Sequence, residues 1–368
     1  MKILKTKVKL RNLKWRHRLT ALFCVTTLAL GAFWCTPVLA KGLSALVDKI
    51  ALSSAMFALP SGTLYVAETY YNREDIKDDI PEIVTPPTTS SDTPISAPVY
   101  DNVPVDRRGK IEEITYLSSM SNNIVTFKNA SIRNDTKYSA EKVEKILETE
   151  FEITLDEGPQ VLIMHTHTTE SYELSDRSYF DTDSTSRTTE NNKNMARIGA
   201  ILNETLRENG IFSIQDTTQH DFPSYNGSYD RSRETVKKYL EKYPSIKIVL
   251  DIHRDAIERD DGTRIKPVTV INGKKAAQLM IISGCDDGEM NMPNWKENLR
   301  FSSALQNALE TKYPTLMRPV MFCYRKYNQD LTTGSILIEV GGHGNSIEEA
   351  QYSAKLLGET LAELLNKK

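Results

Sequence analysis

The chain has 368 residues, of which 39% are apolar and 26% charged, so it can form one large globular domain or two smaller ones. Its formal net charge of −3 argues against nucleic acid as a partner. The four cysteines include no C-x-x-C pair, which argues against a cysteine zinc site or a thioredoxin-like motif. Cys285 and Cys323 leave two alternatives open, a single disulfide or two buried thiols.

The N-terminal segment predicts a membrane anchor. Residues 1–19 form a basic tail, in which positions 1–18 hold eight Lys or Arg and no acidic residue. Residues 20–40 are uncharged and long enough to span a bilayer as a helix, and the basic tail favours a cytoplasmic N-terminus. The alternative is a signal peptide cleaved after V-L-A, just before Lys41. Both interpretations export the remainder, and we expect a single-pass membrane protein whose C-terminal part lies outside the cell.

The next two segments connect this anchor to the folded part of the chain. Residues 41–109 are expected to form a stalk and a linker, because positions 81–100 are rich in Pro, Thr and Ser and poor in apolar residues. Residues 110–158 contain a short alternating run at 124–127 and a helix-like stretch at 140–147. We expect them to form a lead-in segment that packs on the following domain.

Residues 159–368 predict a domain of the α/β class, with a central and mostly parallel sheet flanked by helices. Apolar runs alternate here with amphipathic stretches, and Ser346 with Glu349 forms a capping box before the clearest helical stripe. In such sheets, functional sites gather at the carboxyl ends of strands. The predicted strands are 161–164, 212–215, 246–252, 268–271, 279–283, 320–324 and 336–340, and the predicted helices are 194–208, 231–242, 295–312 and 346–366.

The stretch V-L-I-M-H-T-H-T-T-E-S-Y at 161–172 carries the first part of a predicted metal site. A buried strand ends before His165, and His167 and Glu170 then form an H-x-x-E pair. Imidazole and carboxylate are zinc ligands, and a catalytic zinc site needs three protein ligands and one open position. His253, at the end of another apolar run, supplies the third ligand. Glu190 is the rival carboxylate, although its place before a helix also suits simple N-terminal capping.

The remaining candidates surround that predicted metal site. Glu339 lies inside the apolar run I-L-I-E-V, where burying a lone carboxylate is costly unless the group has a task. A general base for a zinc-bound water is such a task, so we expect Glu339 to be catalytic. His165, Arg254 and Asn328 are expected to contact substrate. For His165 two alternatives stay open, since it could bind the metal itself or orient a metal ligand.

Several motifs together resemble the stage II sporulation protein P family of peptidoglycan hydrolases. They are H-T-H-T-T-E-S-Y at 165–172, N-M-A-R-I-G at 194–199, D-I-H-R-D-A at 251–256, Y-N-Q-D-L at 327–331 and L-I-E-V-G-G at 337–342. The resemblance implies a zinc-amidase-like catalytic domain over 159–368, facing the cell wall. It also implies an N-acetylmuramoyl-L-alanine amidase activity on peptidoglycan, with a further endopeptidase activity credited to the family.

The resemblance further implies septal wall thinning and engulfment during sporulation, together with stage II sporulation proteins D and M. In related zinc amidases the metal glutamate opens the first helix, which would favour Glu190, whereas the H-x-x-E spacing favours Glu170. We expect Glu170. Two other functions stay open: a carboxypeptidase-type metallopeptidase acting on wall peptides, and a non-catalytic wall-binding scaffold of the engulfment complex.

Overall fold

The computed structural model describes residues 103–366. The predicted basic tail, the anchor at 20–40 and the linker lie outside the described residues. Within the described part of the chain, no helix is both long and apolar enough to cross a membrane. The elements in order are η1 (Val105–Arg107), β1 (Arg108–Ile114), η2 (Ser118–Met120), β2 (Ile124–Phe127), β3 (Ala130–Asn134), α2 (Ala140–Leu147), β4 (Val161–Met164), β5 (Tyr179–Asp181), α3 (Met195–Glu208), β6 (Ser213–Gln215), α4 (Ser228–Lys242), β7 (Ile248–Asp255), β8 (Arg264–Ile271), β9 (Lys274–Ala277), β10 (Leu279–Gly284), α5 (Trp295–Lys312), β11 (Val320–Cys323), β12 (Gly334–Gly342) and α6 (Ile347–Asn366).

The large sheet has eight strands in the order β2-β3-β11-β10-β12-β7-β4-β6. The pairs β2/β3 and β10/β12 are antiparallel, and the other neighbouring pairs are parallel. The prediction of a mostly parallel central sheet is therefore confirmed. The predicted lead-in segment is more than a neighbour of this sheet, because β2 and β3 form one of its edges.

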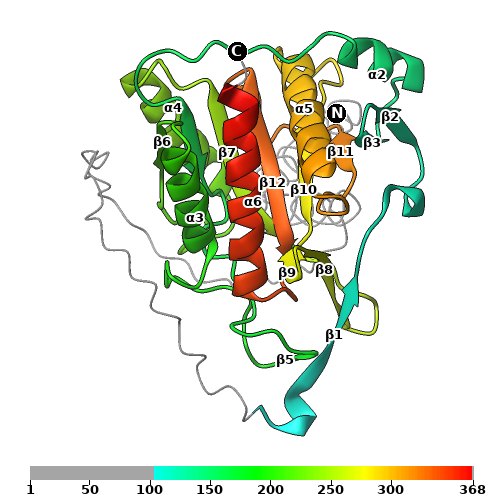
Figure 1. Ribbon diagram of the computed structural model, residues 1–368. Helices are drawn as coiled ribbons and strands as arrows, with labels where there is room; N and C mark the ends of the chain where they lie inside the picture. Colours follow the sequence, from blue (N-terminus) through cyan, green and yellow to red (C-terminus); the bar gives the residue numbers. More distant parts are fainter. Residues whose placement is uncertain (1–102, 367–368) are drawn as a thin grey trace, which may run out of the picture. The chain divides into compact units, whose positions relative to one another are not determined.

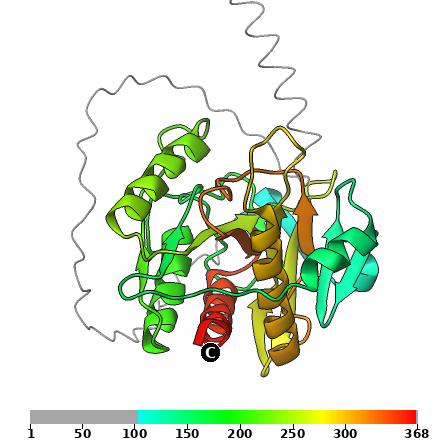
Figure 2. The ribbon, with the colours of Figure 1, turned by 90° about the horizontal axis from the view of Figure 1, so that it is seen from above.

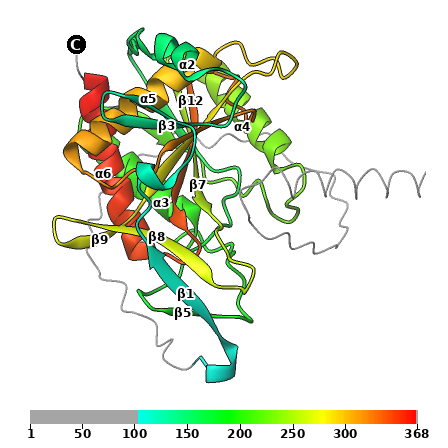
Figure 3. The same cartoon turned by 90° about the vertical axis from the view of Figure 1, so that its right-hand side faces the viewer.

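Helices cover the two faces of the large sheet unequally, as the views in Figures 1 and 3 show. Helices α3, α6 and α5 lie side by side on one face, and α2 packs against α5. Strand residues such as Ile163, Leu250 and Ile338 face these helices in the main core. On the other face α4 packs its Val236 and Tyr239 on β4 and β7 in a smaller cluster, and Figure 2 shows the strands between α4 and α6. Helices thus cover the face that carries α4 less completely than the face that carries α3, α5 and α6.

A second sheet, with the order β5-β1-β8-β9, was not predicted. The run 268–271 was expected in the central sheet, but it belongs to β8 of this smaller sheet and pairs with β1 in parallel and β9 in antiparallel register. The two strands that flank β8 come from different parts of the chain: β1 lies near the start of the described residues, and β9 follows β8 directly as a hairpin. Residues before 159 therefore share one folded unit with those after it.

Most predicted elements agree with the structure within a few residues. The stretch 140–147 is α2, 161–164 is β4 and 295–312 is α5. The capping box of α6 is also present, since the Glu349 N–H donates to Ser346 Oγ at 3.2 Å and the Ser346 N–H donates to Glu349 Oε2 at 3.0 Å. Cys285 and Cys323 are buried free thiols rather than a disulfide. Burial raises their pKa values to about 12 and about 11, which leaves both unreactive near neutral pH.

Candidate active site

The loop that follows β4 is buried along its whole length, from His165 to Tyr172. Its threonines explain how a polar segment can be buried, because each one finds a partner from another element. Thr166 donates from its N–H and its hydroxyl to the Asp251 carboxylate at 2.8 and 2.7 Å. Thr168 donates to the Thr218 carbonyl at 2.6 Å, and Thr169 donates to Asp221 at 2.6 Å. The T-H-T-T run thereby fixes the backbone that carries His167 and Glu170.

The structure brings three of the predicted residues together at the carboxyl ends of β4 and β7. Glu170 Oε2 lies 3.6 Å from Nδ1 of His253. The rings of His167 and His253 meet edge to face with 5.2 Å between their centroids. All three side chains are at least 90% buried. Two imidazoles and one carboxylate therefore lie close together at this edge of the sheet.

Asp251 orients His253 from the same strand. Residues two apart on a strand point to the same face. His253 Nε2 lies 2.8 Å from Asp251 Oδ1, so the two groups form an ion pair. The contact does not meet the geometry of a hydrogen bond. Burial opposes a charged ring here, but Asp251 and Glu170 outweigh it and hold the pKa of His253 well above its usual value. A carboxylate behind one ring nitrogen leaves the other, Nδ1, facing Glu170, which is the arrangement seen in carboxylate–histidine–metal triads.

Glu339 reaches this point from β12. The parallel register of β12 and β7 pairs Glu339 with His253, so the two side chains share one sheet face. Its Oε2 is buried without a hydrogen-bond partner among the described residues. Burial raises the pKa of Glu339 to about 8, and the nearby Asp255 adds to this effect. The carboxyl can therefore gain or lose a proton close to neutral pH.

These residues are of the chemical types that bind zinc, but their ligand atoms do not all lie within 4.8 Å of one another in the described structure. His167 Nδ1 is buried with no hydrogen bond in the described structure, and burial lowers the pKa of this ring to about 3, so it is neutral and keeps a lone pair. Burial opposes ionisation of Glu170, but His253 and two arginines outweigh it and lower the pKa of this carboxyl, which stays charged. A neutral imidazole and a carboxylate are the forms that bind zinc. His253, whose pKa is raised by Asp251 and Glu170, would have to release a proton when the ion binds.

A second acidic cluster is already occupied by a lysine. Within residues 103–366, carboxylate oxygens of Glu113, Asp176 and Glu349 lie within 4.8 Å of one another, close enough to hold a metal ion. However, the fully buried Lys266 places its Nζ at 3.0 Å from Glu113, 2.5 Å from Asp176 and 2.7 Å from Glu349. The lysine supplies the counter-charge, so this cluster is an ion-pair network that ties the small sheet to α6.

Two of the sequence candidates lie away from the convergent site or behind it. His165 is fully buried, with Nδ1 at 3.0 Å from the Ile252 carbonyl and Nε2 at 3.2 Å from Gln215. This placement suits a residue that positions the strand end before His253, not one that touches substrate. Glu190 is exposed and pairs with Lys193 at 2.6 Å. Of the two rival carboxylates, the structure therefore places Glu170 beside His253.

Arg254 and Asn328 are also engaged by other parts of the protein. The Arg254 guanidinium donates to the carbonyls of Ser171 and Ser186, each at 2.7 Å, and so ties together the loop around Glu170. Asn328 donates to the Tyr229 carbonyl at 2.9 Å and to Ser232 Oγ at 3.1 Å. Both side chains hold neighbouring segments in place, and their contact with substrate stays a prediction.

Aromatic side chains near the site were not predicted, with the exception of Tyr327 in Y-N-Q-D-L. Tyr225 stacks on His167 with 4.4 Å between ring centroids. Tyr229, on the first turn of α4, stands edge-on to His167 at 5.6 Å and stacks on Tyr327 at 5.1 Å. Tyr327 has a left-handed backbone with φ +44°, which is uncommon for a non-glycine residue and marks a constrained turn. The signal in the sequence was only the Y-N-G-S-Y run at 225–229.

Arg187 also lies beside Glu170, and its place there was not predicted from the sequence. It contacts Glu170 at 3.2 Å and Asp221 at 2.7 Å, and its guanidinium carbon lies 5.0 Å from the ring centre of Tyr225. About a third of its side chain stays exposed (37%). Arg187 and Tyr225 are thus partly exposed to solvent and border the buried residues of the site.

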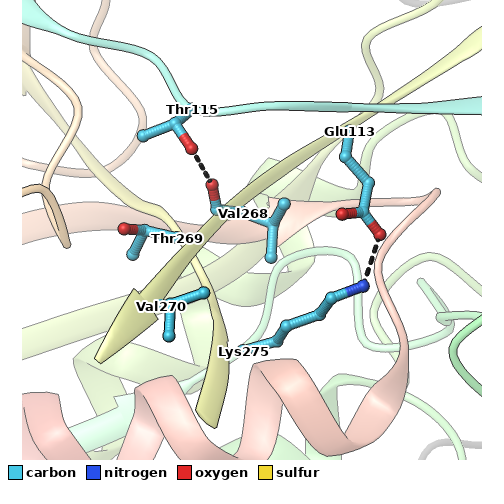
Figure 4. A pocket seen from close by; sticks show the side chains of 6 residues that line it. All are labelled: Glu113, Thr115, Val268, Thr269, Val270 and Lys275. Carbon is cyan, nitrogen blue, oxygen red and sulfur yellow. Dashed lines mark hydrogen bonds and ion pairs between the residues drawn. The ribbon is translucent and has the colours of Figure 1, made fainter. Parts of the chain in front are cut away.

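A surface hollow of about 160 Å³ lies on the small sheet, and it contains none of the candidate residues. Figure 4 shows it between β1 and the β8–β9 hairpin, with the Thr115 hydroxyl bound to the Val268 carbonyl and Lys275 paired with Glu113. Its lining is polar and solvent-exposed in large part, and we assign it no chemistry. The lining residues are Glu113, Thr115, Val268, Thr269, Val270 and Lys275.

Comparisons with known proteins agree with the motifs. The family model described as stage II sporulation protein P matches residues 76–362. The stage II sporulation protein P of Bacillus subtilis (strain 168) is 31% identical over 215 residues, which cover 55% of this chain and 50% of that protein. The chain thus spans about half the length of the curated relative that it matches.

Solved structures with some similarity include an N-acetylmuramyl-L-alanine amidase from Mycobacterium smegmatis, with a TM-score of 0.35 and 12% identity over 57% of this chain and 98% of that one. The CwlD amidase from Clostridioides difficile has a TM-score of 0.35 and 13% identity over 57% of this chain and 100% of that one.

Proposed function

Since this chain belongs to the stage II sporulation protein P family, we propose that it is a zinc-dependent N-acetylmuramoyl-L-alanine amidase that cuts peptidoglycan during sporulation. One observation carries the proposal: His167, Glu170, His253 and Glu339 converge at the carboxyl ends of the adjacent strands β4, β7 and β12. The reaction adds water across the amide that joins lactyl-muramic acid to the stem peptide, and it releases a carboxylic acid and a free amine.

His167, Glu170 and His253 would hold the zinc ion. Bound there, zinc would lower the pKa of a coordinated water toward 7 and would polarise the amide carbonyl. Asp251 keeps the His253 ring in position from behind. Arg254 holds the loop that carries Glu170, through the carbonyls of Ser171 and Ser186. The ligands therefore come from segments that are each fixed by buried hydrogen bonds, as a preorganised site requires.

Glu339 moves the proton. Its buried Oε2 is the free acceptor beside His253, so it takes the proton of the attacking water and later returns it to the nitrogen of the leaving amine. Burial raises the pKa of the Tyr229 phenol well above its usual value. This phenol therefore keeps its proton at neutral pH and can donate a hydrogen bond to substrate beside the two histidines.

The cellular setting completes the proposal. We place the protein in the cell membrane through its N-terminal segment, with the catalytic part facing the wall, and working with stage II sporulation proteins D and M in engulfment. An endopeptidase activity on peptide cross-links would use the same residues. A carboxypeptidase-type metallopeptidase and a non-catalytic scaffold are the outcomes against which the amidase is tested.

The test combines metal analysis with product analysis on the full-length protein. About one zinc per chain, together with free stem peptides from digested peptidoglycan, is the expected result. The Glu339→Gln variant should keep the zinc and lose the cleavage, because only the proton acceptor is removed. Full cleavage by that variant would reject the role of Glu339. Products trimmed only at peptide ends would indicate a carboxypeptidase, and neither zinc nor cleavage would favour a scaffold.

A further inference from the structure

Two exposed aromatic side chains stand on one loop beside the candidate active site. Among the described residues, Phe222 and Tyr225 are the aromatic members of the set of exposed large apolar side chains, at 57% and 51% exposure. Both belong to the loop between β6 and α4, which we call the platform loop (residues 216–227). One face of the Tyr225 ring lies on His167, with 4.4 Å between centroids. The partly exposed ring of Tyr225 therefore contacts a candidate metal ligand directly.

The platform loop is fixed by many polar contacts. Arg231 of α4 donates to three of its carbonyls, those of His220 at 2.6 Å, Asn226 at 3.1 Å and Ser224 at 2.5 Å. Asp221, in the middle of the loop, accepts hydrogen bonds from the loop that follows β4 and forms an ion pair with Arg187. Exposed aromatic rings on a rigid loop have already lost the freedom that binding would otherwise cost.

The position of these rings points to the class of ligand. The amide proposed for cleavage has a muramic acid on its carbonyl side and a peptide on its amine side. A sugar ring must consequently lie within a few ångströms of the zinc ligands whenever that bond is in place. The C–H faces of a pyranose are apolar and flat, and aromatic side chains offer rigid contact area for such faces. A pure peptidase would have no sugar at this place.

We propose that Phe222 and Tyr225 form a binding platform for the muramic acid ring of the glycan strand. The proposal rests on the proposed amidase function and deepens it, because the platform would select the bond next to a sugar. The Tyr225 ring is stacked on His167, and the exposed Phe222 lies three residues earlier on the same loop. Arg187, 5.0 Å from the Tyr225 ring, borders the platform on the polar side.

The experiment measures binding, so it does not depend on catalysis. Two probes are titrated calorimetrically into the zinc-loaded, full-length protein: a peptide-free tetrasaccharide of alternating N-acetylglucosamine and N-acetylmuramic acid, and a lactoyl-tripeptide without sugar. Phe222→Ala and Tyr225→Ala should each weaken tetrasaccharide binding about 2- to 12-fold, the range for one lost aromatic contact. Tyr225→Trp and Phe222→Tyr should restore it. Val270→Ala, which removes an equally exposed apolar side chain from β8, is the matched control and should change nothing.

The outcomes separate this proposal from the amidase. Unchanged tetrasaccharide affinity in both alanine variants, or no measurable binding by the wild-type protein, would overturn the platform. It would also be overturned if the variants lost affinity for the lactoyl-tripeptide alone, since the rings would then recognise peptide. Absence of stem-peptide release, with sugar binding present and lost in the variants, would leave the platform standing and reject only the amidase. Zinc content, measured in every variant, shows whether Tyr225→Ala has disturbed His167.

Discussion

Replacing Glu339 by glutamine should change how the stability of the zinc-free protein depends on pH. In the folded protein burial raises the pKa of this carboxyl to about 8, from 4.5 in the unfolded chain. Below pH 4.5 the group is protonated in both states and contributes no difference. Between pH 4.5 and 8 the folded state binds the extra proton, so the stability of the wild type falls as pH rises through this window. Glutamine has a similar shape and no proton to lose.

The size of the effect follows from the shift. Each pH unit of difference corresponds to about 1.4 kcal/mol, and the window spans roughly three and a half units. Relative to the wild type, the Glu339→Gln protein should therefore gain at most about 5 kcal/mol in free energy of unfolding between pH 4.5 and pH 8. The neutral buried rings of His165 and His167 act on stability in both proteins alike, so they cancel in the difference.

Urea denaturation of chelator-treated protein at pH 5, 6, 7 and 8 would measure this difference. The free energy of unfolding of the variant minus that of the wild type should grow steadily with pH. Saturating zinc should reduce the slope for the wild type, because a nearby dication favours the charged carboxylate. A difference that is constant from pH 5 to pH 8 would refute the argument, since it would mean that Glu339 titrates as an ordinary exposed carboxyl.

Three further predictions concern the metal site and the scaffold around it. His167→Ala should abolish zinc binding, measured by elemental analysis, whereas Glu190→Ala should keep it, because Glu190 is paired with a surface lysine. Lys266→Met should lower the free energy of unfolding, measured by urea denaturation, by about 3–5 kcal/mol, because it removes one partner of a buried ion-pair network. The control Lys275→Met, at the exposed edge of that network, should lower it by less than about 1 kcal/mol. Gly341→Ala should cost at least about 1 kcal/mol, because the backbone there has φ +65° and a Cβ atom would lie 2.6 Å from a neighbouring side-chain oxygen; a melting temperature unchanged from wild type would contradict this.

The large sheet could be predicted because its segments carry local signals. The buried run of β4 and the long apolar stripe of α6 are periodic over their own lengths, and no partner is needed to recognise them. The small sheet has no such signal. Strand β5 has three residues, and β9 reads Lys-Lys-Ala-Ala. What holds this sheet is non-local, namely β-pairing across more than a hundred residues and ion pairs to the buried Lys266.

The centre of the candidate site could be predicted for a different reason. Parallel neighbouring strands end at the same edge, so residues that follow two apolar runs are brought together if the runs are neighbours. His167 and Glu170 follow β4, His253 lies near the end of β7, and Glu339 lies in β12; these three strands are adjacent. Side-chain partners were not predictable in this way. The groups that engage the side chains of His165 and Asn328 come from segments 50 to 99 residues away in the chain.

The alternation of side-chain directions along β7 explains where Arg254 lies, and this alternation can be read from the sequence. In β7 the odd-numbered residues Val249, Asp251, His253 and Asp255 share a face, and the even-numbered ones point the other way. The polar residues thus gather on the face that α4 covers incompletely, where Glu339 also lies through its register with His253. Arg254 is one residue out of phase with His253, so its side chain could not join His253 on that face. Its place in the structure, bound to the carbonyls of Ser171 and Ser186, is the one that this alternation requires. In a strand, a charged residue directly next to a metal ligand therefore points to the other face of the sheet, where it can support loops. Only residues two positions from the ligand share its face and are candidates for the same site.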